Sequence, residues 1–169
     1  MKRFGLFLIL FLLFVLEGTI FARFLPVGNA YQVQIVPAFV FVAILLMAFF
    51  GDYAIRYAVL FGFLIDLVYT STLGVYAFCM GLTVYLIHAL SKWLSMNVAT
   101  TLLLVAAGVC LLQTGVYVIY LMIGQTDQTL LSFFKFRLPG TVAVNVAFAL
   151  IIYYPFRRFL LYVNRPEEH

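Results

Sequence analysis

Two carboxylates within apolar sequence are the residues best placed to do chemistry in this chain. Glu17 and Asp66 each stand inside a long run of apolar side chains. A pair of carboxyl groups at one depth in a membrane could serve as general acid and base or relay a proton. Each would also cost about 2.5–3.5 kcal/mol if it faced lipid at the centre of a bilayer. Both side chains must therefore face protein, water or a partner.

Three roles stay open for this pair. The carboxyl groups could hydrogen-bond neighbouring helices, with Asn145 and Gln113 as candidate partners. They could instead contact the helix of a partner protein, or take part in transport or catalysis. Hydrogen bonding between helices is the simplest interpretation.

Other reactive residue types are sparse. His88 has only His169 as a second histidine, and Cys79 and Cys110 stand in apolar stretches without paired spacing. A metal site needs further ligands at suitable spacing. The sequence also contains no H-E-x-x-H, no G-x-S-x-G and no phosphate-binding glycine loop. We expect no catalytic, cofactor or metal site, and no enzymatic activity.

The composition places the chain in a membrane. Of its 169 residues, 66% are hydrophobic and 9% are charged, and the mean hydropathy is +1.15. Soluble domains have about 45–50% apolar and about 25% charged residues. Since one crossing takes about 20 apolar residues, the length allows roughly six or seven helices. We expect an all-α integral membrane protein with a single transmembrane domain over residues 1–169.

Breaks in the apolar pattern divide the chain into six expected helices. The spans are about residues 4–24, 35–50, 53–69, 73–90, 98–123 and, after a polar loop at 124–139, from 141 past Pro155. Pro37 is expected in the first turn of the second span, where a missing N–H is tolerated.

Basic residues favour cytoplasmic positions for both termini. In a soluble chain the formal charge of +4 would suggest nucleic acid, but here it indicates orientation, and we expect no nucleic-acid partner. With six crossings, the inner side holds Lys2, Arg3, Arg56, Lys92, Arg157, Arg158 and Arg165, and the outer side holds Arg23, Lys135 and Arg137. Cytoplasmic loops carry the excess of Lys and Arg. Glu17 and Asp66 then lie about 20 Å along their helices, in the outer half at similar depth.

Small and polar residues predict a tight contact between the third and fourth helices. Gly62, Asp66 and Thr70 recur every four residues and form one stripe on the third helix. Ala77 and Gly81 form a small-xxx-small pair on the fourth, which allows close approach of two backbones. We expect a hairpin whose packing buries Asp66.

The segment over residues 61–76, F-G-F-L-I-D-L-V-Y-T-S-T-L-G-V-Y, resembles the central motif of the MreD family of rod shape-determining proteins. In that family, a third helix containing Asp leads through a Tyr-Thr-Ser turn into a Leu-Gly-x-Tyr helix. The opening M-K-R-F, the glutamate late in the first helix, V-P at 36–37 and P-F-R at 155–157 are also similar, so the resemblance spans nearly the whole chain. It carries over to Glu17, Gly62, Asp66, Tyr69, Thr70, Gly74 and Tyr76.

The resemblance implies a non-catalytic scaffold in the bacterial cytoplasmic membrane. Its implied partner is MreC, through the transmembrane helix and adjacent segments of that protein. MreB, RodA and a class B penicillin-binding protein are reached indirectly, and a homodimer stays open. The family is also similar in architecture to the substrate-binding subunits of energy-coupling-factor transporters. The alternative is a vitamin-type binding subunit of a transporter, with a cavity lined by Glu17, Asp66, Gln113 and Asn145.

Overall fold

The computed structural model describes residues 2–24, 35–50, 53–95 and 97–163, and these residues are predominantly helical. The elements are α1 (Lys2–Phe24), α2 (Phe39–Phe50), α3 (Ala54–Tyr69), α4 (Val75–Ser91), α5 (Val98–Met122), α6 (Leu130–Ser132), the π-helical turn η1 (Phe133–Arg137) and α7 (Leu138–Val163). No strand occurs within these ranges. The prediction of an all-α chain is confirmed for this part of the protein.

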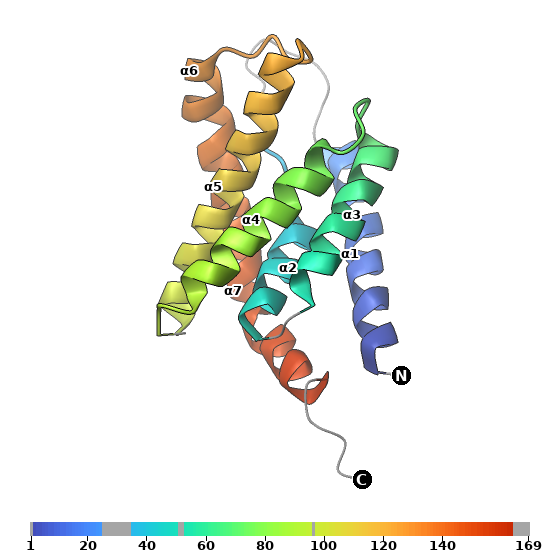
Figure 1. The fold of residues 1–169 in the computed structure, drawn as a ribbon, viewed down its shortest axis with the longest axis vertical. Coiled ribbons are helices and arrows are strands. Elements are labelled where there is room, and N and C mark those ends of the chain that lie inside the picture. The colour runs from blue at the N-terminus through green and yellow to red at the C-terminus, as the bar shows by residue number, and fades with distance from the viewer. Residues whose placement is uncertain (1, 25–34, 51–52, 96, 164–169) are drawn as a thin grey trace.

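Helix α2 forms the centre of the bundle. It contacts α1, α3, α4, α5 and α7, and Figure 1 shows it enclosed among them. Every residue from 40 to 48 is at most 5% exposed. A helix that is apolar all round suits a protein core or the lipid of a membrane. The uninterrupted apolar sequence of α2 is therefore compatible with its central position.

The second span is only partly helical. Helix α2 has 12 residues, which at a rise of about 1.5 Å per residue is shorter than the roughly 30 Å of bilayer hydrocarbon. Residues 35–38 before it are not helical. Pro37 therefore precedes the helix, and the expectation that it lies in the first turn is wrong. A proline disfavours helical conformation in the residue before it, which delays the beginning of α2.

The expected polar loop at 124–139 is also wrong over its second half. Helical structure begins at Leu130 and continues through α6, η1 and α7. The Thr129 side chain accepts a hydrogen bond from the Ser132 N–H and caps this beginning. Pro139 stands at the second position of α7, directly after the wider π turn. In the π turn, a backbone N–H bonds to the carbonyl oxygen five residues earlier, as that of Leu138 does to Phe133. The regular helical bonding is therefore already interrupted next to Pro139, which lacks an N–H, and the helix continues past the proline.

Within the described residues, two helices are long and apolar enough to cross a membrane, α5 and the continuous helix Leu130–Val163. Shorter apolar helices are Phe4–Thr19, Phe39–Phe49 and Val75–Ser91. Figure 1 shows the beginning of α1 and the end of α7 toward one end of the bundle, and the α3–α4 and α5–α6 connections at the other. This arrangement agrees with two termini on the same side of a membrane, whereas the number of crossings stays a prediction.

Helices α3 and α4 form the expected hairpin. A Cβ atom added at Gly62 would lie 2.6 Å from the Ala77 Cα atom, and one added at Gly81 would lie 2.9 Å from the Val59 Cγ2 atom. Neither distance leaves room for a side chain. The small residues therefore permit the close crossing of the two helices, and Asp66 is fully buried between them.

We expect Gly62→Ala to destabilise the protein, by about 1–3 kcal/mol as for other overpacked interiors. Thermal unfolding of the purified protein in mild detergent measures the effect. Gly5→Ala is the matched control, because its Cβ atom would meet only Phe159 at 3.9 Å, an ordinary contact. Both changes gain similar helix propensity. The difference between their melting temperatures therefore reports the collision of the new methyl group with the Ala77 backbone. Equal melting temperatures for the two variants would contradict the close crossing.

Candidate functional site

Asp66 binds the backbone at the beginning of α4. The N–H groups of Gly74 and Ala77 donate to Oδ2, and that of Tyr76 donates to Oδ1, each at 3.0 Å. The first N–H groups of a helix have no partner within it, and the positive end of the helix dipole favours a carboxylate. Gly74, at the N-cap position, has no side chain to fill this role. Asp66 therefore caps α4 from the preceding helix.

The turn between α3 and α4 completes this unit. Thr70 is the C-cap residue of α3 and has extended backbone. Of the expected stripe, Gly62 and Asp66 therefore lie within the helix and Thr70 lies just after it. The Thr70 hydroxyl lies 3.0 Å from the Asp66 carbonyl oxygen and 2.9 Å from that of Thr72. Gly74 has a φ of +93°, in the left-handed region that favours glycine. The turn and the carboxylate together fix the angle at which α4 leaves α3.

Asn145 binds the non-helical segment before α2. Its Nδ2 atom donates to the carbonyl oxygens of Val36 at 3.1 Å and Thr141 at 2.8 Å, and its Oδ1 atom accepts from the Ala38 N–H at 2.8 Å. The Thr141 hydroxyl accepts from the Val36 N–H at 3.1 Å. Asn145 and Thr141 are both fully buried. Helix α7 thus supplies the hydrogen bonds that residues 35–38 cannot make within a helix.

Side chains from two other helices bond both ends of α2. The Val40 N–H donates to Glu17 Oε2 at 3.1 Å in the first turn. His88 Nδ1 lies 2.6 Å from the Ala48 carbonyl oxygen near the last turn. The sequence predicted His88 as an ordinary interfacial histidine rather than a metal ligand, and its contact with α2 was not predicted. The signal for this contact was a histidine within a largely apolar span.

The prediction that Asn145 and Gln113 are the hydrogen-bond partners of the two carboxyl groups is wrong. Asn145 and Gln113 were candidates, but the recorded hydrogen bonds of Glu17 and Asp66 go mainly to backbone N–H groups at helix beginnings. A buried N–H without an acceptor costs about 1–3 kcal/mol. The first N–H groups of a helix have no partner within it, so in an apolar interior they are the groups that most need an acceptor. The two carboxyl groups therefore bind there.

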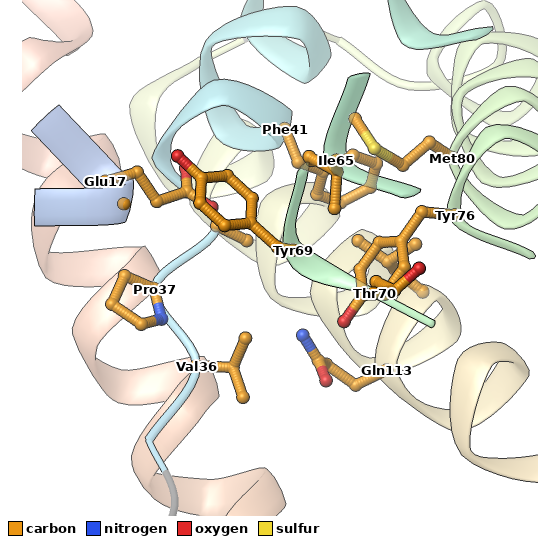
Figure 2. Close-up of a pocket in the computed structure, with 13 residues that line it drawn as sticks. Glu17, Val36, Pro37, Phe41, Ile65, Tyr69, Thr70, Tyr76, Met80 and Gln113 are labelled. Carbon is orange, nitrogen blue, oxygen red and sulfur yellow. The ribbon is translucent and has the colours of Figure 1, made fainter. Parts of the chain in front are cut away.

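A cavity of about 110 Å³ lies where α1, α2, α3, α4 and α5 meet (Figure 2). It is lined by Glu17, Gly18, Val36, Pro37, Ala38, Phe41, Ile65, Tyr69, Thr70, Tyr76, Met80, Leu112 and Gln113. Of the four residues expected to line a ligand cavity, Glu17 and Gln113 do so. Asp66 and Asn145 are not among the lining residues, because their polar atoms are bonded to backbone elsewhere.

Gln113 differs from the other buried polar side chains. It is 2% exposed, and neither its Oε1 nor its Nε2 atom has a hydrogen-bond partner among the residues that the structure describes. An unsatisfied buried amide costs about 1–3 kcal/mol. The side chain reaches the cavity in Figure 2.

The arrangement favours holding helices together over reacting with a substrate. Within the described ranges, no three His, Cys, Asp or Glu side chains are grouped so that they could hold a metal ion. Cys79 and Cys110 are free thiols. The hydrogen bonds of Asp66, Asn145, Glu17 and His88 described above are all made to backbone groups.

Comparison with known proteins gives two matches. A family model described as rod shape-determining protein MreD matches residues 1–163. The rod shape-determining protein MreD of Bacillus subtilis (strain 168) is 33% identical over 168 residues, which cover 98% of this chain and 97% of that relative. No solved structure matches, so the expected similarity to energy-coupling-factor subunits stays a prediction.

We expect Asp66→Leu to unfold more easily than Asp66→Asn, and both more easily than the parent. Leucine leaves three N–H groups of α4 without their acceptor, at about 1–3 kcal/mol for each. An amide retains one accepting oxygen, but its NH₂ group faces donors. Thermal unfolding in detergent measures the order, with the exposed Asp127→Asn as control. Equal losses for Asn and Leu would show that the negative charge itself, rather than hydrogen bonding, is required.

Proposed function

Because the chain belongs to the MreD family of rod shape-determining proteins, we propose that it is a non-catalytic scaffold of the bacterial elongation complex, which organises peripheral cell-wall synthesis. The observation that carries this proposal is the extent of the match, which covers nearly all of both chains. The interior chemistry supports it. The polar side chains that a catalyst would need are bonded to helix ends.

The proposed partner is MreC, with MreB, RodA and a class B penicillin-binding protein reached through it. The connections between α2 and α6 are at most seven residues long, so they leave little protein outside that part of the bundle. Contacts with a partner must therefore be made largely along the helices. In lipid, an interhelical hydrogen bond contributes only about 0.6–2 kcal/mol, so several contacts act together.

We propose further that the protein lies in the bacterial cytoplasmic membrane and crosses it six times, with both termini inside. The support is the excess of basic residues near one end, where Lys2, Arg56, Lys92 and Arg157 are found. The termini and the α4–α5 connection share that end in Figure 1.

Labelling with a membrane-impermeant thiol reagent tests the orientation. We expect Asp127→Cys to react in cells stripped of their wall, and Ser95→Cys to react only after permeabilisation. Both positions are exposed and lie at opposite ends of α5. The parent, with Cys79 and Cys110, gives the background. The reverse pattern would contradict the orientation, and reaction of both in intact cells would contradict the crossing by α5.

Photo-crosslinking in living cells tests the partner. Five similarly exposed apolar positions on different helices can carry the crosslinker: Leu12, Leu67, Phe78, Leu103 and Ile151, which are 59–74% exposed. We expect adducts with MreC to concentrate on neighbouring helices, because a single partner helix contacts only one side of a bundle. Since exposure is matched, each position is a control for the others. Absence of adducts at all five, with both proteins intact, would contradict the scaffold proposal.

A further inference from the structure

Gln113 is a buried amide whose hydrogen-bonding capacity is unused within the described part of the protein. It is 2% exposed and lines the cavity between α1, α2, α3, α4 and α5. Buried polar groups in native proteins are almost always paired with protein or with ordered water. The NH₂ group of Gln113, with two N–H donors, and its carbonyl acceptor therefore call for a partner that the cavity could hold.

The rest of the cavity wall contains both apolar side chains and side chains that carry oxygen atoms. Phe41, Ile65, Met80 and Leu112 supply apolar surface, and Glu17, Thr70 and Tyr76 supply oxygen atoms. Figure 2 shows Gln113 on the side of Val36 and Thr70, with Met80 and Ile65 farther along the wall. The described lining residues include no Lys or Arg, so an anion would find a carboxyl group and no cation. The Glu17 carboxyl group already accepts a hydrogen bond from the Val40 N–H. The part of the wall around Gln113 carries no charge and therefore suits an uncharged molecule.

The size of the cavity limits the occupant. Its volume is about 110 Å³, whereas an apolar protein cavity of about 150 Å³ accommodates benzene. A single five-membered ring with one polar edge would fill the space. Three or four water molecules, at about 30 Å³ each, would fill it as well.

We propose that this cavity binds a small uncharged molecule that presents an adjacent donor and acceptor, as a cyclic amide does, to the Gln113 side chain. The N–H of such an amide donates to Gln113 Oε1, and its carbonyl oxygen accepts from Nε2. The apolar part of the ring packs against Met80 and Leu112. This binding is independent of the scaffold role proposed above, because it uses interior residues and no partner surface.

The probe is 2-pyrrolidinone, and γ-butyrolactone, in which a ring oxygen replaces the N–H without adding bulk, is its matched control. Saturation-transfer NMR on the full chain in mild detergent measures binding at millimolar ligand concentrations. We expect 2-pyrrolidinone to bind at least tenfold more tightly than the lactone. Equal binding of the two, or no binding of 2-pyrrolidinone, would overturn the proposal, and the second result would indicate a cavity that holds only water.

Three variants locate the binding. Gln113→Leu removes the amide, Leu112→Phe fills the cavity while keeping the amide, and Gln125→Leu makes the same chemical change at an exposed position outside it. We expect binding to be lost in the first two and retained in the third. Retention in Gln113→Leu or in Leu112→Phe would overturn the assignment to this cavity.

The melting temperature of Gln113→Leu gives a second measurement. Because the structure records no hydrogen bond from this side chain to the described residues, replacing it with an apolar side chain should leave the melting temperature unchanged or raise it. A clear fall, or failure to fold, would show that Gln113 is bonded within the protein and would overturn the proposal.

Discussion

The structure depends on one constraint, which is that backbone N–H and C=O groups inside an apolar bundle must find partners without water. Helix interiors meet this constraint by themselves, but helix ends do not. Asp66 supplies acceptors for the beginning of α4, and Asn145 and Glu17 supply bonds around the beginning of α2. His88 contacts a carbonyl near its end. Each of these side chains joins two elements, so satisfying the backbone also fixes the arrangement of the helices.

This constraint also explains the distribution of charge in the interior. A buried carboxylate is costly in lipid, yet Asp66 is surrounded by N–H donors that replace its hydration. A reactive group needs a polar atom that is free to meet a substrate. In the parts of the chain described above, Gln113 is a clear exception, and it faces the cavity rather than a helix end. The bundle thus uses most of these interior polar side chains to build the fold and leaves the Gln113 amide unpaired within the described residues.

Much of the fold follows from sequence pattern, because lipid makes apolar runs and their breaks unusually informative. The α3–α4 hairpin and the burial of Asp66 follow from the four-residue spacing of small and polar residues. The family also followed from the motif over residues 61–76, and the match over residues 1–163 confirms it.

The sequence did not predict which groups meet across the bundle. Local spacing places Asp66 on a helix face, but which N–H donors it reaches depends on where the following turn ends. The positions of two prolines relative to the helices were also not predicted. Pro37 precedes a helix that was expected to contain it, and Pro139 lies within a helix where a loop was expected. In both cases the neighbouring bonds, from Asn145 and from the π turn, decide the outcome.

The central segment has a consequence for biogenesis. Val36 and Ala38 find their partners on α7, which is translated more than one hundred residues later. Until Thr141 and Asn145 have been synthesised, the peptide groups of Val36 and Ala38 lack these partners. The segment before α2 can therefore reach its final form only after α7 has joined the bundle.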